Sequence, residues 1–299
     1  MNDQTQQILT AVQAFGHRFD PEVIGAMRKL IGPMHDAKAI AALACVRDAS
    51  YGSHPRQRLD VYAASHQARP ALLFVHGGGF TAGDKLSADG APFYQNVCLW
   101  AQQQGLVGVA MTYRLAPEFK WPSGADDIGL AVAYLHENAK ALGIDPERIV
   151  LMGQSAGAVH VAHYLSQTAS HRVPGGGVCA GILVSGLYDM VSAQANPPKA
   201  AYFAADPVTQ ASQSALPGLL DCGLPLMMAV NEFDLPDFEH QAHLLATAWL
   251  QRHGHLPWFA QLKGHNHISS ILALGLHEDA LGSEIASFLG RYLQKKPNT

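Results

Sequence analysis

The stretch IVLMGQSAGAV at residues 149–159 decides the fold of this chain. Its first four residues are apolar, as in a strand that is buried on both faces of a sheet. Small residues follow Ser155 and predict a helix that packs closely against that strand. The G-x-S-x-G motif from Gly153 to Gly157 predicts a sharp strand-to-helix turn, which holds a serine hydroxyl clear of the backbone. Ser155 is therefore a candidate nucleophile, and a tight turn with an incidental serine is the structural alternative.

Around this stretch, short apolar runs alternate with longer amphipathic ones, which is typical of repeated strand–helix–strand units. The predicted strands are residues 58–62, 71–75, 107–112, 148–152, 180–184, 224–230 and 258–262. The predicted helices are residues 93–104, 125–142, 155–167, 236–253 and 278–293. Several strands are apolar throughout, so helices should cover both faces of a mostly parallel sheet. The expected fold class is α/β with a doubly wound sheet.

The chain has 299 residues, of which 48% are hydrophobic and 15% are charged, so it can bury a large core. No linker-like segment divides it. We expect a catalytic domain over residues 51–299, preceded by a helical segment over residues 1–50. That segment could form a partial lid over the site or pack on the back of the sheet. Residues 190–225 are rich in Ala, Pro and Ser and are predicted to form connecting segments near the mouth of the site.

The net charge of −4 provides no basic face for nucleic acid or anionic lipid, so neither is an expected partner. The first residues lack the basic and apolar regions of a secretion signal, and no apolar run is long enough to cross a bilayer. A cytoplasmic location is therefore predicted, and a homodimer is compatible with the sequence. The cysteines are widely separated and are interpreted as free thiols: Cys45, Cys98, Cys179 and Cys222.

Three histidine pairs could in principle bind a metal: His160 with His163, His253 with His255, and His265 with His267. No pair has a convincing third ligand at motif spacing, so no metal site is predicted. No cofactor is predicted either.

A second glycine motif, His76-Gly77-Gly78-Gly79, follows the buried strand at residues 71–75. A phosphate-binding loop would require G-x-G-x-x-G or a Lys-Ser/Thr pair, and neither is present. An acyl-transfer enzyme needs unobstructed backbone N–H groups that point at the developing oxyanion. Gly78 and Gly79, together with the N–H of Ala156, are the candidates for this oxyanion hole.

A serine nucleophile needs a base, and the base needs a carboxylate to orient it. Asp234 follows the strand at residues 224–230 and is the preferred acid, with Glu232 as its nearest competitor. His265 and His267 both follow the last predicted strand, where the base of such a fold belongs. From the residues alone, either histidine could be the base.

The order of these motifs resembles the hormone-sensitive-lipase-like esterase family of α/β-hydrolases. The resemblance extends over residues 51–289 and includes YRLAPE at residues 113–118 and WPSGADD at residues 121–127. It implies an α/β-hydrolase fold, a Ser155–His267–Asp234 triad and an oxyanion hole that includes Gly78 and Gly79. The chain departs from the family pattern at Leu235-Pro236, where Pro-Leu is expected, and at Ile268, where an aromatic residue is common.

The family resemblance implies a serine carboxylesterase acting on a small-molecule ester, with an acyl-enzyme intermediate. The loop at residues 83–85 and the turn around Asp234 also resemble feruloyl esterases and arylformamidases of the same fold. An arylformamidase or amidase with the same triad is therefore an alternative, and a non-catalytic binding module is another. Arg114 and Asp127 are interpreted as a buried ion pair behind the oxyanion loop, because buried charges are seldom unpaired.

Overall fold

The computed structural model describes residues 3–63, 67–88, 90–277 and 279–293. Its centre is an eight-stranded sheet with the order β1-β2-β4-β3-β5-β6-β7-β8. The strands are β1 (Cys45–Ser50), β2 (Arg58–Tyr62), β3 (Arg69–Val75), β4 (Val107–Met111), β5 (Ile144–Gln154), β6 (Ala180–Val184), β7 (Leu226–Phe233) and β8 (Trp258–Asn266). β2 pairs antiparallel with β1 and β4, and the pairs from β4 to β8 are parallel.

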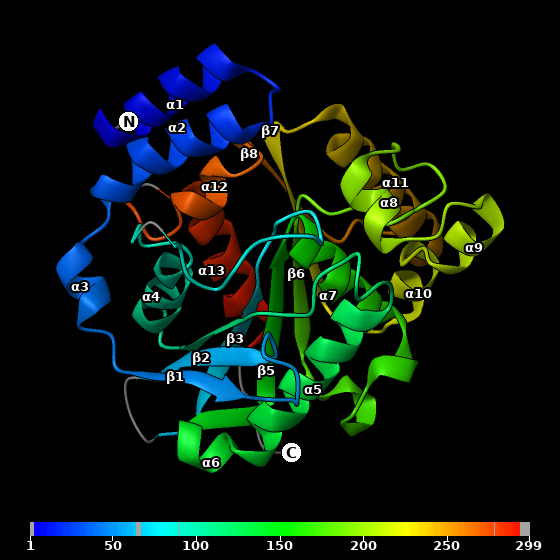
Figure 1. The fold of residues 1–299 in the computed structure, drawn as a ribbon, viewed down its shortest axis with the longest axis horizontal. Helices are drawn as coiled ribbons and strands as arrows, with labels where there is room; N and C mark the ends of the chain where they lie inside the picture. The colour runs from blue at the N-terminus through cyan, green and yellow to red at the C-terminus, as the bar shows by residue number, and fades with distance from the viewer. Residues whose placement is uncertain (1–2, 64–66, 89, 278, 294–299) are drawn as a thin grey trace.

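Helices cover both faces of the sheet, as Figure 1 shows. The α-helices are α1 (Asp3–Phe15), α2 (Pro21–Ile31), α3 (Ala37–Ala41), α4 (Gln95–Gln103), α5 (Ser123–Glu137), α6 (Ala139–Leu142), α7 (Ala156–Ser166), α8 (Pro197–Tyr202), α9 (Pro207–Ser212), α10 (Leu216–Asp221), α11 (Pro236–His253), α12 (Ser269–Leu272) and α13 (Ala280–Tyr292). The 3-10 helices are η1 (Gly32–Met34), η2 (Thr168–Ser170) and η3 (Pro174–Gly177). The predicted doubly wound, mostly parallel α/β fold is confirmed.

Two large apolar clusters lie on opposite faces of the sheet. In β3, Leu73 and Val75 pack into one cluster, with residues of α5, α7 and α11. Leu72 and Phe74 pack into the other, with residues of α4 and α13. Successive side chains of a strand point to opposite faces, so a strand covered on both sides must be apolar at every position. This explains the continuous apolar run of β3.

The prediction that the whole segment of residues 1–50 is helical is wrong for its last part, which forms the edge strand β1. Cys45 and Ala49 of β1 are half-buried, and the other residues of β1 are exposed. An exposed edge strand needs no apolar run, so its sequence carries little strand signal. Met1 and Asn2 of the predicted segment lie outside the described residues.

Residues 190–225 contain three short helices, which the sequence analysis did not predict. The helices α8 and α9 each begin with proline, and each is capped by a side chain in front of it: Asn196 accepts from the N–H of Lys199, and Asp206 accepts from the N–H of Thr209. These are ordinary helix-start signals, but six-residue helices are too short to show an amphipathic period.

The five helices predicted from the sequence are present in the structure, with small differences in their bounds. The helix predicted at residues 236–253 coincides with α11, and Gly254 follows it in the left-handed conformation that favours glycine. The helix predicted at residues 125–142 is two helices that meet at Asn138. Glu278, where the last helix was predicted to begin, lies outside the described residues, and α13 begins at Ala280.

Candidate active site

Ser155 lies in a tight turn between β5 and α7, at φ 55° and ψ −124°. The close approach of neighbouring backbone explains the glycines of the motif. A Cβ atom on Gly157 would overlap the carbonyl oxygens of Val75 and His76, and one on Gly153 would overlap the carbonyl of Gly157. The glycines therefore allow a strained turn that places Ser155 at the carboxyl end of the sheet.

Ser155, His267 and Asp234 lie within hydrogen-bond distance in one line. The Nε2 atom of His267 is 2.9 Å from the Oγ atom of Ser155, and its Nδ1 atom is 2.6 Å from Oδ1 of Asp234. An ionised carboxylate can only accept, so Nδ1 of His267 carries the proton. Nε2 therefore presents a lone pair to the serine hydroxyl, as a general base must.

The Asp234 carboxylate is fully buried and receives further hydrogen bonds on Oδ2, the oxygen that His267 does not contact. Ser185 donates from Oγ at 2.6 Å, and Asn231 donates from its backbone N–H at 2.8 Å. Ser185 lies just after β6 with a φ of 51°. Neither Ser185 nor Asn231 stood out in the sequence, because a lone serine or asparagine near the end of a strand has no motif to mark it.

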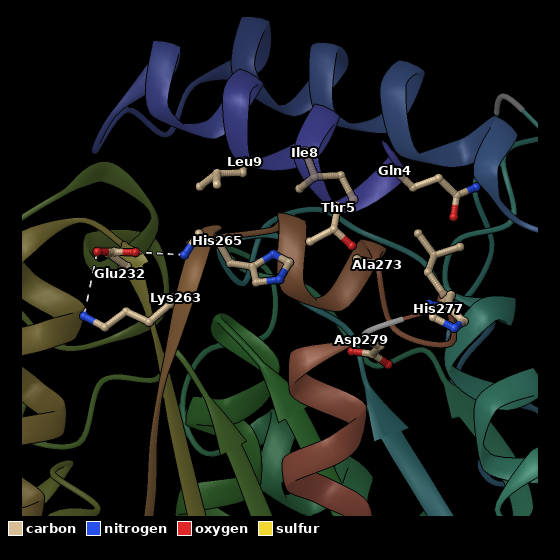
Figure 2. Close-up of a pocket in the computed structure, with 12 residues that line it drawn as sticks. Gln4, Thr5, Ile8, Leu9, Glu232, Lys263, His265, Ala273, His277 and Asp279 are labelled. Atoms are coloured by element: carbon tan, nitrogen blue, oxygen red, sulfur yellow. Dashed lines mark hydrogen bonds and ion pairs between the residues drawn. The ribbon is translucent and has the colours of Figure 1, made fainter. Parts of the chain in front are cut away.

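Glu232, the competing acid, points elsewhere. Its carboxylate accepts from the N–H of Gly264 at 2.8 Å and lies 3.7 Å from the Lys263 ammonium. Figure 2 shows these two interactions beside the ring of His265. The geometry therefore favours Asp234 over Glu232 as the partner of the base.

His265, the competing base, is also separated from Ser155. Its Nδ1 atom lies 3.0 Å from the hydroxyl of Ser269, and burial lowers its pKa to about 4. Its ring faces a cavity beneath α1, as seen in Figure 2. His265 lies within β8 and His267 follows that strand, and only His267 meets Ser155.

Two aromatic rings hold the imidazole of His267. Phe238 of α11 stacks on it with a centroid distance of 4.2 Å, and Phe19 meets it edge-on at 4.3 Å. The side-chain amide of Gln154 also donates to the carbonyl of His267 at 2.9 Å. These contacts restrict the ring to the orientation in which its two nitrogens face Ser155 and Asp234.

The glycine loop after β3 lies beside Ser155. Gly78 and Gly79 have φ values of 126° and 58°, and a Cβ atom on Gly78 would overlap the carbonyl of Ala82. Gly78 borders the cavity on one side of Ser155, while Gly79 and Ala156 border the cavity on the other side. The structure thus brings together all the residues that the sequence suggested for an oxyanion hole.

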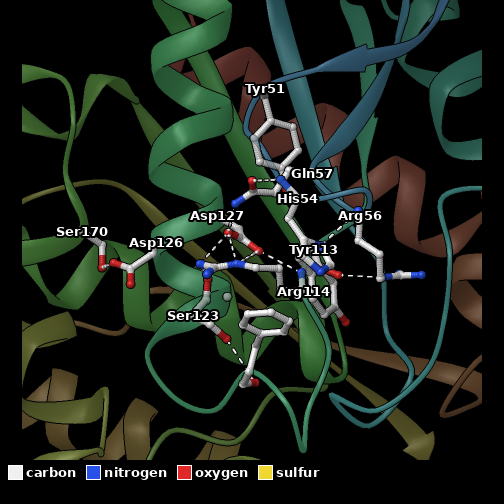
Figure 3. Close-up of polar contacts among 12 residues, drawn as sticks. Tyr51, His54, Arg56, Gln57, Tyr113, Arg114, Ser123, Asp126, Asp127 and Ser170 are labelled. Carbon is white, nitrogen blue, oxygen red and sulfur yellow. Dashed lines mark hydrogen bonds and ion pairs between the residues drawn. The ribbon is translucent and has the colours of Figure 1, made fainter.

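A buried ion pair supports this loop from behind, and Figure 3 shows its contacts. Asp127 is fully buried and lies 2.8 Å from the Nη2 atom of Arg114, whose backbone N–H also donates to it at 2.8 Å. Burial raises the pKa of Asp127, and its hydrogen bonds from Arg114 and Gln57 oppose this shift. The adjacent Tyr113 donates from its hydroxyl to the carbonyl of His76 at 2.9 Å. The predicted Arg114–Asp127 pair is confirmed.

Two cavities meet at Ser155. One, of about 460 Å³, includes Gly77, Gly78 and Tyr94 in its walls. The other, of about 430 Å³, lies between the glycine loop and the residues that precede α8, with Gly79 and Asn196 in its walls. The prediction that residues 190–225 lie near the mouth of the site is therefore confirmed for their first part. Each cavity is large enough for a small organic group.

Four cysteines form no disulfide bond, as predicted: Cys45, Cys98, Cys179 and Cys222.

Among the described residues, no three His, Cys, Asp or Glu side chains lie close enough together to bind a metal ion. The His160 ring is buried and contacts Phe80, Tyr113 and Tyr202. In the part of the chain that the structure covers, no helix has the length and apolar character of a membrane span.

Comparison with known proteins shows related sequences around the serine motif. The family model BD-FAE matches residues 59–176, which is less than half of the chain. An ethyl acetate hydrolase of Pseudomonas putida is 38% identical over 107 residues, which cover 35% of this chain and 31% of that protein. The carboxylesterase NlhH of Mycobacterium tuberculosis is 37% identical over 100 residues, covering 33% of this chain and 30% of that protein. The matched region thus spans about a third of the length of these relatives.

The fold is shared over nearly the whole chain. An esterase of Pyrobaculum calidifontis superposes with a TM-score of 0.67 at 22% identity, covering 96% of this chain and 97% of that one. At this identity, the match bears on the fold and not on the reaction.

Proposed function

We propose that this chain, an α/β-hydrolase of the hormone-sensitive-lipase-like esterase type, hydrolyses small carboxylic esters with Ser155, His267 and Asp234 as its catalytic triad. The observation that carries the proposal is the continuous line of hydrogen bonds from Ser155 through His267 to Asp234, with lengths of 2.9 and 2.6 Å. The line ends at a buried carboxylate and begins at a serine between two cavities. This arrangement is suited to nucleophilic acyl transfer.

In the first half of the reaction, Oγ of Ser155 attacks the ester carbonyl carbon while Nε2 of His267 takes the hydroxyl proton. The N–H groups of Gly78, Gly79 and Ala156 stabilise the negative oxygen of the tetrahedral intermediate. His267 then returns the proton to the leaving alkoxy oxygen. The C–O bond breaks, the alcohol departs, and the acyl group remains on Ser155.

In the second half, a water molecule takes the place of the alcohol. His267 removes a proton from this water, which attacks the acyl carbon, and the second tetrahedral intermediate collapses with return of the proton to Ser155. The carboxylic acid leaves and the serine is regenerated. Throughout, Asp234 stabilises the imidazolium that forms on His267 and keeps its ring in place.

A short acyl chain is part of this proposal. The relative from Pseudomonas putida is named for ethyl acetate, an ester with a two-carbon acyl group. The space on each side of Ser155, about 460 and 430 Å³, accommodates a small group on each side of the ester bond. We therefore expect p-nitrophenyl acetate to be hydrolysed faster than long-chain esters.

The test compares the wild-type chain with Ser155→Ala on p-nitrophenyl acetate. The variant should lose turnover by at least about 10,000-fold, the lower end of what removal of a triad member costs, and retain its thermal unfolding midpoint. A fluorophosphonate probe should label the wild type at Ser155 and leave the variant unlabelled. Near-normal activity of Ser155→Ala would refute the triad.

Whether the enzyme cleaves an ester or an amide bond requires a separate measurement, because an arylformamidase or amidase would use the same triad. Wild-type kcat/KM values for an aryl ester and for N-formylkynurenine decide between them. We expect the ester to be preferred, and a higher value for the formamide would assign the chain to amide hydrolysis instead.

A further inference from the structure

The loop between α1 and α2 crosses the candidate active site. It consists of residues 16–20 and is called the strap below. Nδ1 of His17 lies 2.7 Å from the backbone carbonyl of Asp234. A carbonyl only accepts, so this ring nitrogen donates. The His17 ring also contacts Phe233 at a centroid distance of 5.5 Å. One end of the strap is thereby attached to the backbone of the proposed acid.

The other end of the strap is fixed by the start of α2. Asp20 is the N-cap of this helix and accepts from the N–H of Val23 at 3.1 Å. Arg18 forms ion pairs with Asp20 at 2.8 Å and with Glu22 at 2.7 Å, although both pairs are at the surface and contribute little. Phe19 lies between these two attachments, so its backbone is held on both sides.

Phe19 is placed as the boundary between the two cavities. Phe19 and Ser155 are the two residues that line both of them. The ester carbon that Ser155 attacks carries the acyl chain on one side and the alkoxy group on the other, and the two point in different directions. The two cavities offer separate space for these two groups, and the centroid of the Phe19 ring lies 4.3 Å from that of His267.

Phe19 contributes little to the core of the protein. Its side chain is 37% exposed, and it belongs to none of the apolar clusters found among the described residues. Phe15, four residues earlier, packs against the core beneath α1. The observation that points to contact with substrate is its position beside Ser155 in the walls of both cavities, in addition to its contact with the His267 ring.

We propose that Phe19 is a specificity-determining residue, whose ring separates the acyl and alcohol compartments and limits the length of the group that one of them admits. The inference rests on the proposed ester hydrolysis at Ser155. It assigns to the segment before the sheet a direct part in substrate selection. Removal of the ring should join the two cavities into one longer cleft.

The test measures kcat/KM over two ester series for the wild type, Phe19→Ala and Phe19→Trp. One series is p-nitrophenyl acetate, butyrate and octanoate, and the other is ethyl, butyl and octyl acetate. In at least one series, Phe19→Ala should raise the ratio of the longest to the shortest substrate by about tenfold or more, because even one methylene changes selectivity on that scale. Phe19→Trp should lower the same ratio, and KM should account for most of the change.

The matched control is Phe15→Ala, which removes a phenylalanine ring from the last residue of α1, outside both cavities. It should lower the thermal unfolding midpoint and leave the ratios unchanged, whereas Phe19→Ala should leave the midpoint nearly unchanged. An active Phe19→Ala enzyme with wild-type ratios in both series would overturn this inference alone. Absence of ester hydrolysis by the wild type would overturn the proposed function and this inference with it.

Discussion

Ser185 donates a hydrogen bond of 2.6 Å to Oδ2 of Asp234, the carboxylate oxygen opposite the one that faces His267. The carboxylate is thus held from two sides, by the end of β6 and by the loop after β8. Because Asp234 is fully buried, no solvent replaces a lost donor. The orientation of the proposed acid depends on a residue 49 positions earlier in the chain.

We expect Ser185→Ala to lower kcat for p-nitrophenyl acetate by about tenfold with little change in KM. Loss of one hydrogen bond to a charged group costs about 1.5–3 kcal/mol, and the two remaining bonds from Asn231, from its backbone N–H and its side-chain amide, limit the effect. Ser170→Ala is the control, because Ser170 donates to the carboxylate of Asp126 far from the site. Equal losses in the two variants would indicate a general effect on stability.

His265 and His267, at the end of β8 and just after it, should respond differently to substitution. His267→Ala should lose at least about 1,000-fold in kcat, since no base then faces Ser155. His265→Ala should retain kcat within about tenfold, because its ring faces the cavity beneath α1. Steady-state kinetics on one aryl ester measure both effects. Loss of activity in His265→Ala alone would reverse the assignment of the base.

Gly78→Ala should reduce kcat by about 100- to 1,000-fold, the usual cost of one lost oxyanion donor. The added Cβ would overlap the carbonyl of Ala82, so the loop must move and its N–H must turn. The control is Gly105→Ala, which also has a positive φ, of 77°, and no atom within 4 Å of the added Cβ. Only Gly78→Ala should lose activity, and comparable losses in both would point to backbone strain as the cause.

Acid should destabilise the protein through buried histidines. Burial lowers the pKa of His265 to about 4, from an ordinary value near 6.5. As the pH falls from 6.5 to 4, the unfolded chain binds a proton that the folded chain does not, so the free energy of unfolding decreases. The shift corresponds to at most about 3 kcal/mol.

His265→Gln should therefore lose less stability than the wild type between pH 7 and pH 4.5, as measured by urea unfolding at both pH values. The exposed His240 provides the control, and His240→Gln should show the wild-type pH dependence. A wild-type dependence in His265→Gln as well would contradict the assignment of acid sensitivity to this ring.

The sheet and the order of the site residues could be predicted from local patterns. β2 and β6 coincide with the predicted ranges, because β2 alternates polar and apolar residues and β6 is a short apolar run. Ser155 could be identified because a nucleophile in this turn requires glycines on both sides. The strand β1 could not, since its exposed residues have no apolar period.

The residues that contact the proposed triad could not be predicted from the sequence. Ser185 contacts Asp234, which lies 49 positions later in the sequence. Phe19 contacts His267, more than 200 positions later. Contacts of this kind depend on how the strands are ordered in the sheet and leave no spacing to recognise. The choice between His265 and His267 likewise depends on the fold, because the His265 ring faces the cavity beneath α1 and the His267 ring meets Ser155.

The position of β8 at the edge of the sheet determines when the site can form during folding. Ser155 and His267 are separated by 112 residues, and His267 reaches the serine only after β8 has paired with β7. Contacts between distant parts of a chain form slowly, because the intervening loop must be closed first. A partly folded chain can therefore have a complete turn around Ser155 and still lack its base. During refolding, ester hydrolysis is therefore expected to return only once β8 has joined the sheet.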